Sequence, residues 1–195
     1  MKKIFLIIII ILNNTTQSFA QELQDGQKRW SETLKLTVDD FKIKTSDNTN
    51  DAVYSQFMIS HSLSGFDFMK RNLNKKIQNL FLGNASWIDT TKVESIDKQI
   101  DFQQMQFDLA EIQARKFRKR ILIDKRKISK GFDIVNKISN EIMSEFSKIR
   151  LELIRETEGG ENEEKIAKWK KQITSQLKEL NEFRFDNKKK IKLKK

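Results

Sequence analysis

The sequence predicts an α+β fold, in which a small, mostly antiparallel N-terminal sheet is followed by three long helices. In the first half, short runs alternate apolar and polar residues with the period of a half-buried strand. From about Val93 onward, apolar residues recur at every third or fourth position, which is the period of an amphipathic helix. The chain of 195 residues contains no proline to interrupt long helices, and its length fits one domain with its own core.

Residues 1–20 are expected to be a signal peptide. Lys2-Lys3 form a charged start, residues 4–12 form an apolar run, and Ser18-Phe19-Ala20 supplies the small residues of a cleavage site. The apolar run is shorter than the ~20 residues that a membrane span needs, and an uncleaved anchor helix is the competing interpretation. We therefore predict an exported protein, periplasmic or secreted, with no transmembrane segment after cleavage. The chain has no cysteine, which excludes disulfides and a lipid-anchored form.

Three alternating runs, at residues 34–38, 53–63 and 77–82, are the expected strands. Residues 21–33 are expected to be a polar lead-in, with Trp30 close to the start of the folded domain. A loop rich in Ser, Asp, Asn and Thr separates the first run from the second. Together these runs predict the small sheet that precedes the first long helix.

The first helix is apolar over much of its circumference between Phe102 and Phe117, so we expect it to be the central helix. The second helix is expected over residues 128–157 and the third over residues 162–183, each with one apolar face. Gly159-Gly160 separates them, and so short a break between two amphipathic helices predicts an antiparallel helical hairpin. The residues that the hairpin is expected to bury are Phe132, Val135, Ile142, Phe146, Trp169, Ile173 and Leu177.

The first helix carries a segment that resembles a known family. Phe107-Asp108-Leu109-Ala110-Glu111-Ile112, followed by Ala114-Arg115, is similar to the helix of secreted zinc-dependent protease-like bacterial proteins, which are catalogued mainly as a domain of unknown function. That helix reads roughly HEQxHFDxxExxAR, and its histidines bind one zinc ion from the same face. The resemblance implies a zincin-like scaffold. It also implies a structural role for the residues that match the family's helix, which are Phe107, Asp108, Glu111, Ala114 and Arg115.

The metal-binding half of this motif is absent. Phe102 stands at the first histidine, Gln103 at the glutamate and Gln106 at the second histidine. A phenyl ring has no lone pair for a metal, and a neutral amide is a poor zinc ligand and no general base. The resemblance therefore implies a catalytically degenerate protein with no catalytic residue, no metal and no cofactor. An active zinc hydrolase with other ligands is the alternative, although His61 is the single histidine of the chain.

Four glutamines form a stripe on the first helix at spacings of four, three and seven residues: Gln99, Gln103, Gln106 and Gln113. The resemblance places this face toward the substrate cleft, where side-chain amides could bind a peptide backbone but could not activate water. The expected ligand is thus a peptide or protein. The plainer interpretation is that glutamines are good helix formers at a surface.

An acidic stripe lies on the same helix at Asp97, Asp101, Asp108 and Glu111. A hard cation such as calcium needs six or more oxygen ligands, which one helix stripe cannot supply. We expect a solvated face paired with neighbouring cations, for example Glu111 with Arg115.

The net charge of +11 is concentrated in two clusters. Residues 115–130 hold nine Lys or Arg side chains, and residues 187–195, a basic tail after the domain at residues 21–186, hold six lysines. These clusters could bind an anionic polymer or an anionic envelope surface, and nucleic acid is not an expected partner of an exported protein. The plainer interpretation is a solvated helix end and a solubilising tail.

Overall fold

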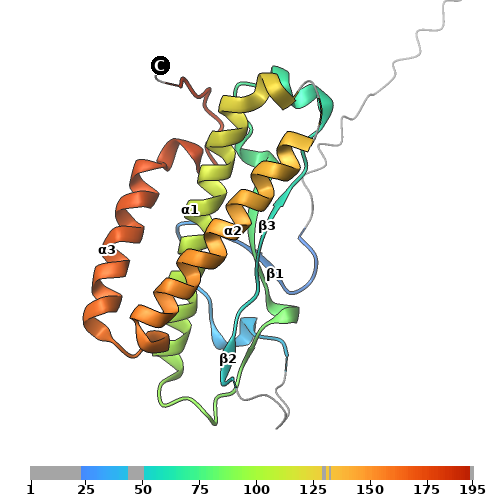
Figure 1. The fold of residues 1–195 in the computed structure, drawn as a ribbon. Helices are drawn as coiled ribbons and strands as arrows, with labels where there is room; N and C mark the ends of the chain where they lie inside the picture. The colour runs from blue at the N-terminus through green and yellow to red at the C-terminus, as the bar shows by residue number, and fades with distance from the viewer. Residues whose placement is uncertain (1–22, 44–50, 129–130, 132, 194–195) are drawn as a thin grey trace, which may run out of the picture.

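The computed structural model describes residues 23–43, 51–128, 131 and 133–193, and the expected signal peptide lies outside them. The chain folds as predicted into an α+β structure in which a small antiparallel sheet precedes three helices (Figure 1). Within the described residues, no helix is both long and apolar enough to cross a membrane.

The strands form two antiparallel groups. The larger sheet has the order β1-β4-β3, and its strands are β1 (Gln27–Arg29), β3 (Phe57–His61) and β4 (Ile77–Leu82). The smaller pair joins β2 (Val53–Tyr54) to β5 (Trp87–Ile88). In the larger sheet Arg29 faces Leu80 on β4, and Phe57 faces Phe81 from the opposite side of that strand.

The predicted strand at residues 77–82 is confirmed, and two other expectations for the sheet are wrong. Residues 34–38 are not a strand, because the backbone N–H of Leu36 donates to the side chain of Gln104 (2.9 Å) rather than to a neighbouring strand. Instead, the expected lead-in contains β1, which pairs with β4. The expected run at 53–63 is divided between β2 and β3, which belong to different sheets.

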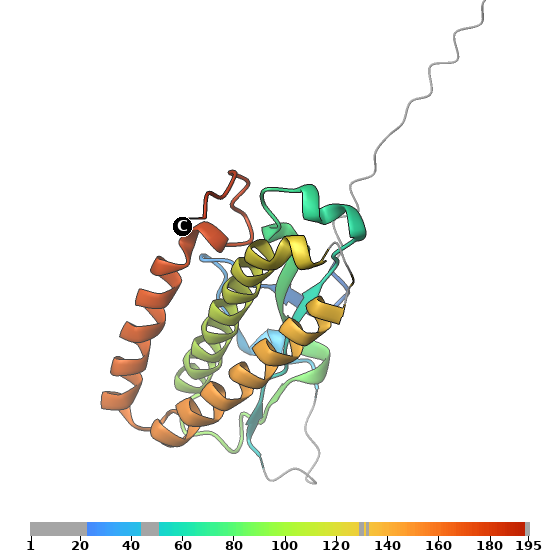
Figure 2. The ribbon, with the colours of Figure 1, turned by 45° about the horizontal axis from the view of Figure 1, so that its top comes forward.

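The first helix, α1 (Ile96–Ile128), is the central element, as predicted. It packs against β3 and β4 as well as against the two later helices, α2 (Asp133–Glu156) and α3 (Glu163–Glu179) (Figures 1 and 2). Its side chains are therefore buried around almost the whole circumference between Phe102 and Arg118. Polar residues on this helix must find partners inside the protein.

The second and third helices run in opposite directions and are joined by a short turn at Glu158–Gly160, which is the predicted hairpin arrangement (Figure 1). Each of them packs mainly on α1 rather than on the other. The expected core residues Val135, Ile142, Phe146, Trp169 and Ile173 are buried, and Leu177 is partly buried. Phe132 lies outside the described residues. The second helix was expected from residue 128, but Ile128 is the last residue of α1 and α2 begins at Asp133.

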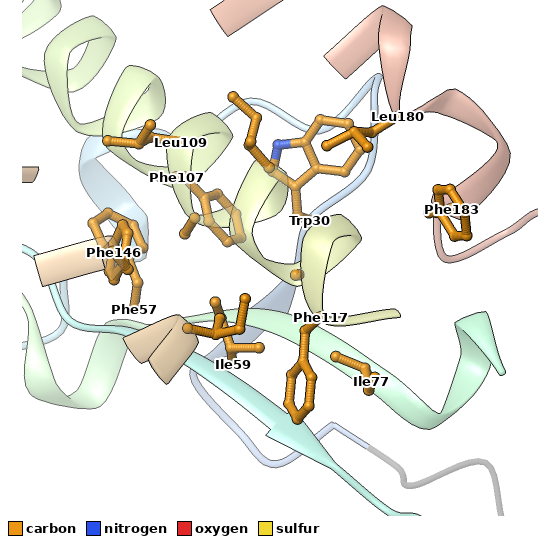
Figure 3. Close-up of a cluster of buried hydrophobic side chains, with 14 of the residues drawn as sticks. Trp30, Phe57, Ile59, Ile77, Phe107, Leu109, Phe117, Phe146, Leu180 and Phe183 are labelled. Carbon is orange, nitrogen blue, oxygen red and sulfur yellow. The ribbon is translucent and has the colours of Figure 1, made fainter. Parts of the chain in front are cut away.

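Aromatic side chains join the three layers of the core (Figure 3). Phe57 of β3 stacks on Phe107 of α1 with ring centroids 5.4 Å apart, and Phe146 of α2 meets Phe57 edge-on at 6.4 Å. Trp30 is buried beside α1, and its indole N–H donates to Asp108 (2.7 Å). These contacts join the sheet and α2 to the N-terminal half of α1, where the predicted site lies.

Candidate functional site

A cavity of about 980 Å³ lies between the N-terminal half of α1, the C-terminal half of α2 and strand β2. Phe102, Gln103 and Gln106 line it from α1, and Arg150 lines it from α2. The three positions at which the resemblance expects His, Glu and His therefore lie together at one cavity.

Three of the four predicted cleft glutamines, Gln99, Gln103 and Gln106, line this cavity, and Gln113 does not. Gln113 is fully buried in the close-packed part of the fold, where neither atom of its side-chain amide has a hydrogen-bond partner among the described residues. Gln99 donates to Glu161 at the cavity rim (3.2 Å).

A chain of hydrogen bonds orients the two deeper glutamines. The guanidinium Nε of Arg150 donates to Gln106 Oε1 (2.7 Å), and Gln106 Nε2 donates to Gln103 Oε1 (3.0 Å). A guanidinium can only donate, so its position fixes which end of each amide accepts. The amino group of Gln103 is then a donor at the end of the chain.

Arg150 is a half-buried cation that no acidic residue neutralises within the described part of the chain. A second bond runs from its Nη2 to the carbonyl of Ser55 (2.9 Å), and its guanidinium lies 5.2 Å from the ring centroid of Phe57. Burial lowers the pKa of the guanidinium. The buried arginines of α1 differ, because Arg115 and Arg118 both donate to Glu111. Within a cavity that Asp51, Glu94 and Glu161 also line, the guanidinium of Arg150 is therefore the group suited to an anionic partner.

Phe102 is buried and packs against Gly160 in the turn between α2 and α3. The lone histidine, His61, is on β3 beside Phe117, in the other half of α1, with ring centroids 5.8 Å apart. Burial lowers the pKa of this histidine. Across the described ranges, no three His, Asp or Glu side chains gather as a metal site would require.

None of the residues that resemble the family's helix lines this cavity. Phe107 and Ala114 are fully buried. Asp108 accepts hydrogen bonds from Trp30 and from Gln104 Nε2 (3.0 Å), and burial raises the pKa of its carboxyl against the effect of these bonds. The expected pair of Glu111 with Arg115 is present (3.1 Å).

The expectation of one solvated acidic face is wrong. Glu111 is 1% exposed and is held by two arginines, whereas Asp97 and Asp101 are exposed. The stripe therefore divides into two halves. Asp108 and Glu111 accept hydrogen bonds from neighbouring side chains of the fold, whereas Asp97 and Asp101 are exposed near the start of α1.

The two basic clusters are more ordered than a solvated end and a tail. In the first cluster, residues 115–130, Arg115 and Arg118 are buried, while Arg120 and Lys127 pair with Asp124. In the second, residues 187–195, Asn72 donates to the carbonyls of Asn187 (2.8 Å) and Lys189 (2.7 Å), and Ile191 is buried. The described part of the tail thus packs back onto the domain.

Sequence reasoning missed Arg150, although a signal was present. Along α2, Phe146, Arg150 and Leu153 follow the spacing of the buried face, so an arginine stands in an apolar stripe. An arginine at a core position indicates either an interior partner or a ligand.

Comparisons with protein-family models, with curated proteins and with solved structures found no match to this chain. The site must therefore be interpreted from its own geometry.

Proposed function

We propose that this chain is an exported, catalytically inactive binding protein, a degenerate relative of zinc peptidases, whose cavity takes an extended peptide and binds its carboxylate at Arg150. The observation that carries the proposal is the hydrogen-bonded series Arg150, Gln106 and Gln103 on the wall of a cavity of about 980 Å³. A cavity of this size is within the range of specific ligand sites.

The chemistry of the wall favours an acceptor-rich ligand. The planar guanidinium of arginine suits the two oxygens of a carboxylate, and the remaining donors of Arg150 and Gln103 are available to such a group. The hydroxyl of Ser55, which also lines the cavity, is buried and has no hydrogen-bond partner among the described residues. A bound carboxylate would neutralise Arg150 and could accept from this hydroxyl.

The backbone of β2 supports an extended peptide as the ligand. Ala52 and Tyr54 form the bonds to β5, since Asp89 N donates to Ala52 O (2.7 Å) and Tyr54 is in register with Trp87. The N–H and C=O of Val53 therefore point away from β5, as alternate residues of an antiparallel strand do. Val53 and Ser55 line the cavity, so a peptide placed along this edge would extend toward Arg150.

Hydrolysis is disfavoured by the same residues. A zinc peptidase needs three protein ligands and a base beside the open position, and Phe102, Gln103 and Gln106 supply none of them. The cation of Arg150 at Gln106 also opposes binding of a metal cation there. The active zinc hydrolase remains the alternative that experiment must exclude.

Binding is tested by calorimetric titration with random-sequence peptides that carry a free C-terminal carboxylate, and with the amidated form of the same peptides. We expect the free acids to bind and Arg150→Met to weaken them at least about tenfold, which corresponds to ~1.4 kcal/mol. The matched control is Arg155→Met, at an exposed position of the same helix outside the cavity. Equal affinity of Arg150→Met and the unchanged protein would refute the carboxylate site.

Metal analysis tests the inactive state. We expect protein purified without chelator to contain no stoichiometric zinc and to cleave no generic peptidase substrate when zinc is added. Stoichiometric zinc together with chelator-sensitive cleavage would establish the hydrolase instead.

A further inference from the structure

A short helical turn, Gly65–Met69, carries two of the three most exposed large apolar side chains of the described residues. Phe66 is 76% exposed and Met69 is 64% exposed, whereas Asp67 between them is 2% exposed. The backbone N–H and the hydroxyl of Ser64 both donate to Asp67 Oδ2, at 2.7 and 3.0 Å. The turn is therefore held in one conformation that projects two apolar side chains into solvent.

Basic residues surround this turn. Asp67 pairs with Lys70 (2.7 Å) and with Lys76 (3.4 Å), so its own charge is neutralised. Arg71 and Lys75 are exposed in the following loop. The segment from Lys70 to Lys76 thus presents positive charge directly beside Phe66 and Met69.

The two basic clusters of the sequence converge on the same loop. Lys125, near the end of α1, donates to the carbonyl of Lys70 (3.3 Å). From the C-terminal tail, the N–H of Ile191 donates to the carbonyl of Arg71 (3.3 Å), and Lys188, Lys189 and Lys190 are exposed. The end of α1, the 65–76 loop and the tail lie together at one end of the molecule (Figures 1 and 2). We call this end, formed by residues 65–76, 125–127 and 187–193, the basic end.

We propose that the basic end docks on an anionic lipid bilayer, with Phe66 and Met69 inserted among the headgroups and the lysines and arginines above the anionic phosphates. Exposed aromatic and thioether side chains gain free energy when they leave water for the bilayer interface. Each basic side chain near an anionic surface adds an attraction that salt screens. A soluble polyanion would satisfy the charges but would offer no apolar phase to Phe66 and Met69.

The geometry leaves the cavity accessible. The cavity lies along the N-terminal half of α1, whereas the basic end surrounds the C-terminal end of the same helix. The membrane proposal is thus independent of the peptide proposal, and either can fail without the other.

The test is cosedimentation of the chain from Gln21 onward with vesicles of phosphatidylglycerol and phosphatidylcholine, and with vesicles of phosphatidylcholine alone. We expect binding to the anionic vesicles only, weakened as salt is raised. The double variant Phe66→Ser/Met69→Ser should lose at least about tenfold in vesicle affinity, since it removes two inserting side chains. The matched control is Leu151→Ser, because Leu151 is 67% exposed and lies in the C-terminal half of α2, beside the cavity and outside the basic end.

A charge variant and a second probe separate the lipid from a polyanion. Changing Lys75, Lys188, Lys189 and Lys190 to Gln should weaken binding to vesicles and to dextran sulfate alike. The Phe66→Ser/Met69→Ser variant should keep its affinity for dextran sulfate. Vesicle affinity that depends on the lysines but not on Phe66 and Met69 would overturn the proposal in favour of a polyanion site, and absence of vesicle binding would overturn it outright.

Insertion has its own readout. In Phe66→Trp, the new indole should be quenched by brominated lipid in anionic vesicles, beyond any quenching of the three tryptophans already present in the chain. An indole that brominated lipid does not quench would contradict insertion even where the protein sediments with vesicles.

Discussion

Glu111 is a single carboxylate that neutralises two arginines inside the protein. It is 1% exposed and accepts from Arg115 (3.1 Å) and Arg118 (2.7 Å). We predict that Glu111→Ala lowers the free energy of unfolding by about 3–5 kcal/mol, because two buried guanidinium groups lose their counterion. Urea unfolding measures this.

The matched control for Glu111 is Glu145→Ala. Glu145 pairs with Lys116 at a partly exposed position, so its loss should cost less than about 1 kcal/mol. Similar losses for the two variants would mean that the interior network contributes no more than a surface pair.

Asp108 makes the free energy of unfolding decrease as pH rises, because the pKa of its carboxyl is raised in the folded protein. A carboxylate whose pKa is lowered by folding has the opposite effect. Burial raises the pKa of Asp108, and the hydrogen bonds from Trp30 and Gln104 oppose the rise. The folded state therefore binds the proton more tightly than the unfolded state, whose pKa is about 3.9. Ionisation of Asp108 costs folding free energy as pH rises through the raised folded pKa.

We predict that Asp108→Asn removes this cost. Both hydrogen bonds end on Asp108 Oδ1, an acceptor that asparagine keeps. The variant should thus gain stability relative to the unchanged protein between about pH 4 and pH 7. Urea unfolding at both pH values gives the two differences, and equal differences would contradict the assignment of the pH effect to Asp108.

At the scale of elements, the turn between α2 and α3 depends on Gly160. A Cβ atom there would lie 2.8 Å from Phe102 Cγ, and the φ of Gly160 is +105°. We predict that Gly160→Ala costs about 2–4 kcal/mol of unfolding free energy, from backbone strain together with the overlap on Phe102. Thermal or urea unfolding measures the loss.

Gly159 is the control that separates the two causes. Its φ is +71°, but no atom lies within 4 Å of an added Cβ, so Gly159→Ala should cost only about 1–2 kcal/mol of strain. In the background Phe102→Ala, the cost of Gly160→Ala should fall toward that of Gly159→Ala. An unchanged cost would show that Phe102 does not fix the turn.

The elements that periodicity predicted are those whose own residues decide their conformation. The run at residues 77–82 forms a strand that is buried at five consecutive positions, and the three helices form close to the predicted ranges, with α2 beginning at Asp133 instead of residue 128. Strand β1 could not be predicted, because Gln27-Lys28-Arg29 has no apolar face and forms a strand only through pairing with β4. Residues 34–38 alternate like a strand, yet Leu36 is bonded to a helix side chain.

The sequence predicted which side of α1 faces the candidate site, but it did not predict how far along the helix the cavity extends. The spacing of the glutamines gives the angle of each side chain around α1, and Gln113 shares the angle of Gln106. Seven residues are about 10 Å along a helix, and at that distance the same face has passed from the cavity into the packed core. Arg150 could not be paired with Gln106 from sequence, because the two residues are brought together only by packing of α2 on α1.

At the scale of the whole molecule, removal of the expected signal peptide would determine the residue at which the mature protein begins. We predict cleavage after Ala20, because the charged, apolar and small-residue zones follow in the order of a signal peptide. Intact mass and N-terminal sequencing of exported protein should give Gln21 as the first residue. Mature protein that starts at Met1 would instead favour the anchor helix.

The two proposals assign peptide binding to the N-terminal half of α1 and membrane docking to its C-terminal end. Membrane docking through Phe66 and Met69 would hold the molecule by the end near Lys125, and the cavity beside Gln106 would remain open to peptides in the surrounding solution. A vesicle-bound protein that still binds free-acid peptides with unchanged affinity would show that the tasks are separable.

The interior arginines of α1 also join segments that lie far apart in the chain. Arg115 donates to the carbonyl of Leu177, and Arg118 donates to the carbonyls of Ile77 and Phe183 (3.0 Å to the latter). A chain that emerges N-terminus first therefore presents α1 long before all partners of its charges exist. The hydrogen bonds of Arg115 and Arg118 are therefore complete only once residues 177 and 183 have been made, so the core around these guanidinium groups closes after the C-terminal part of the chain is present.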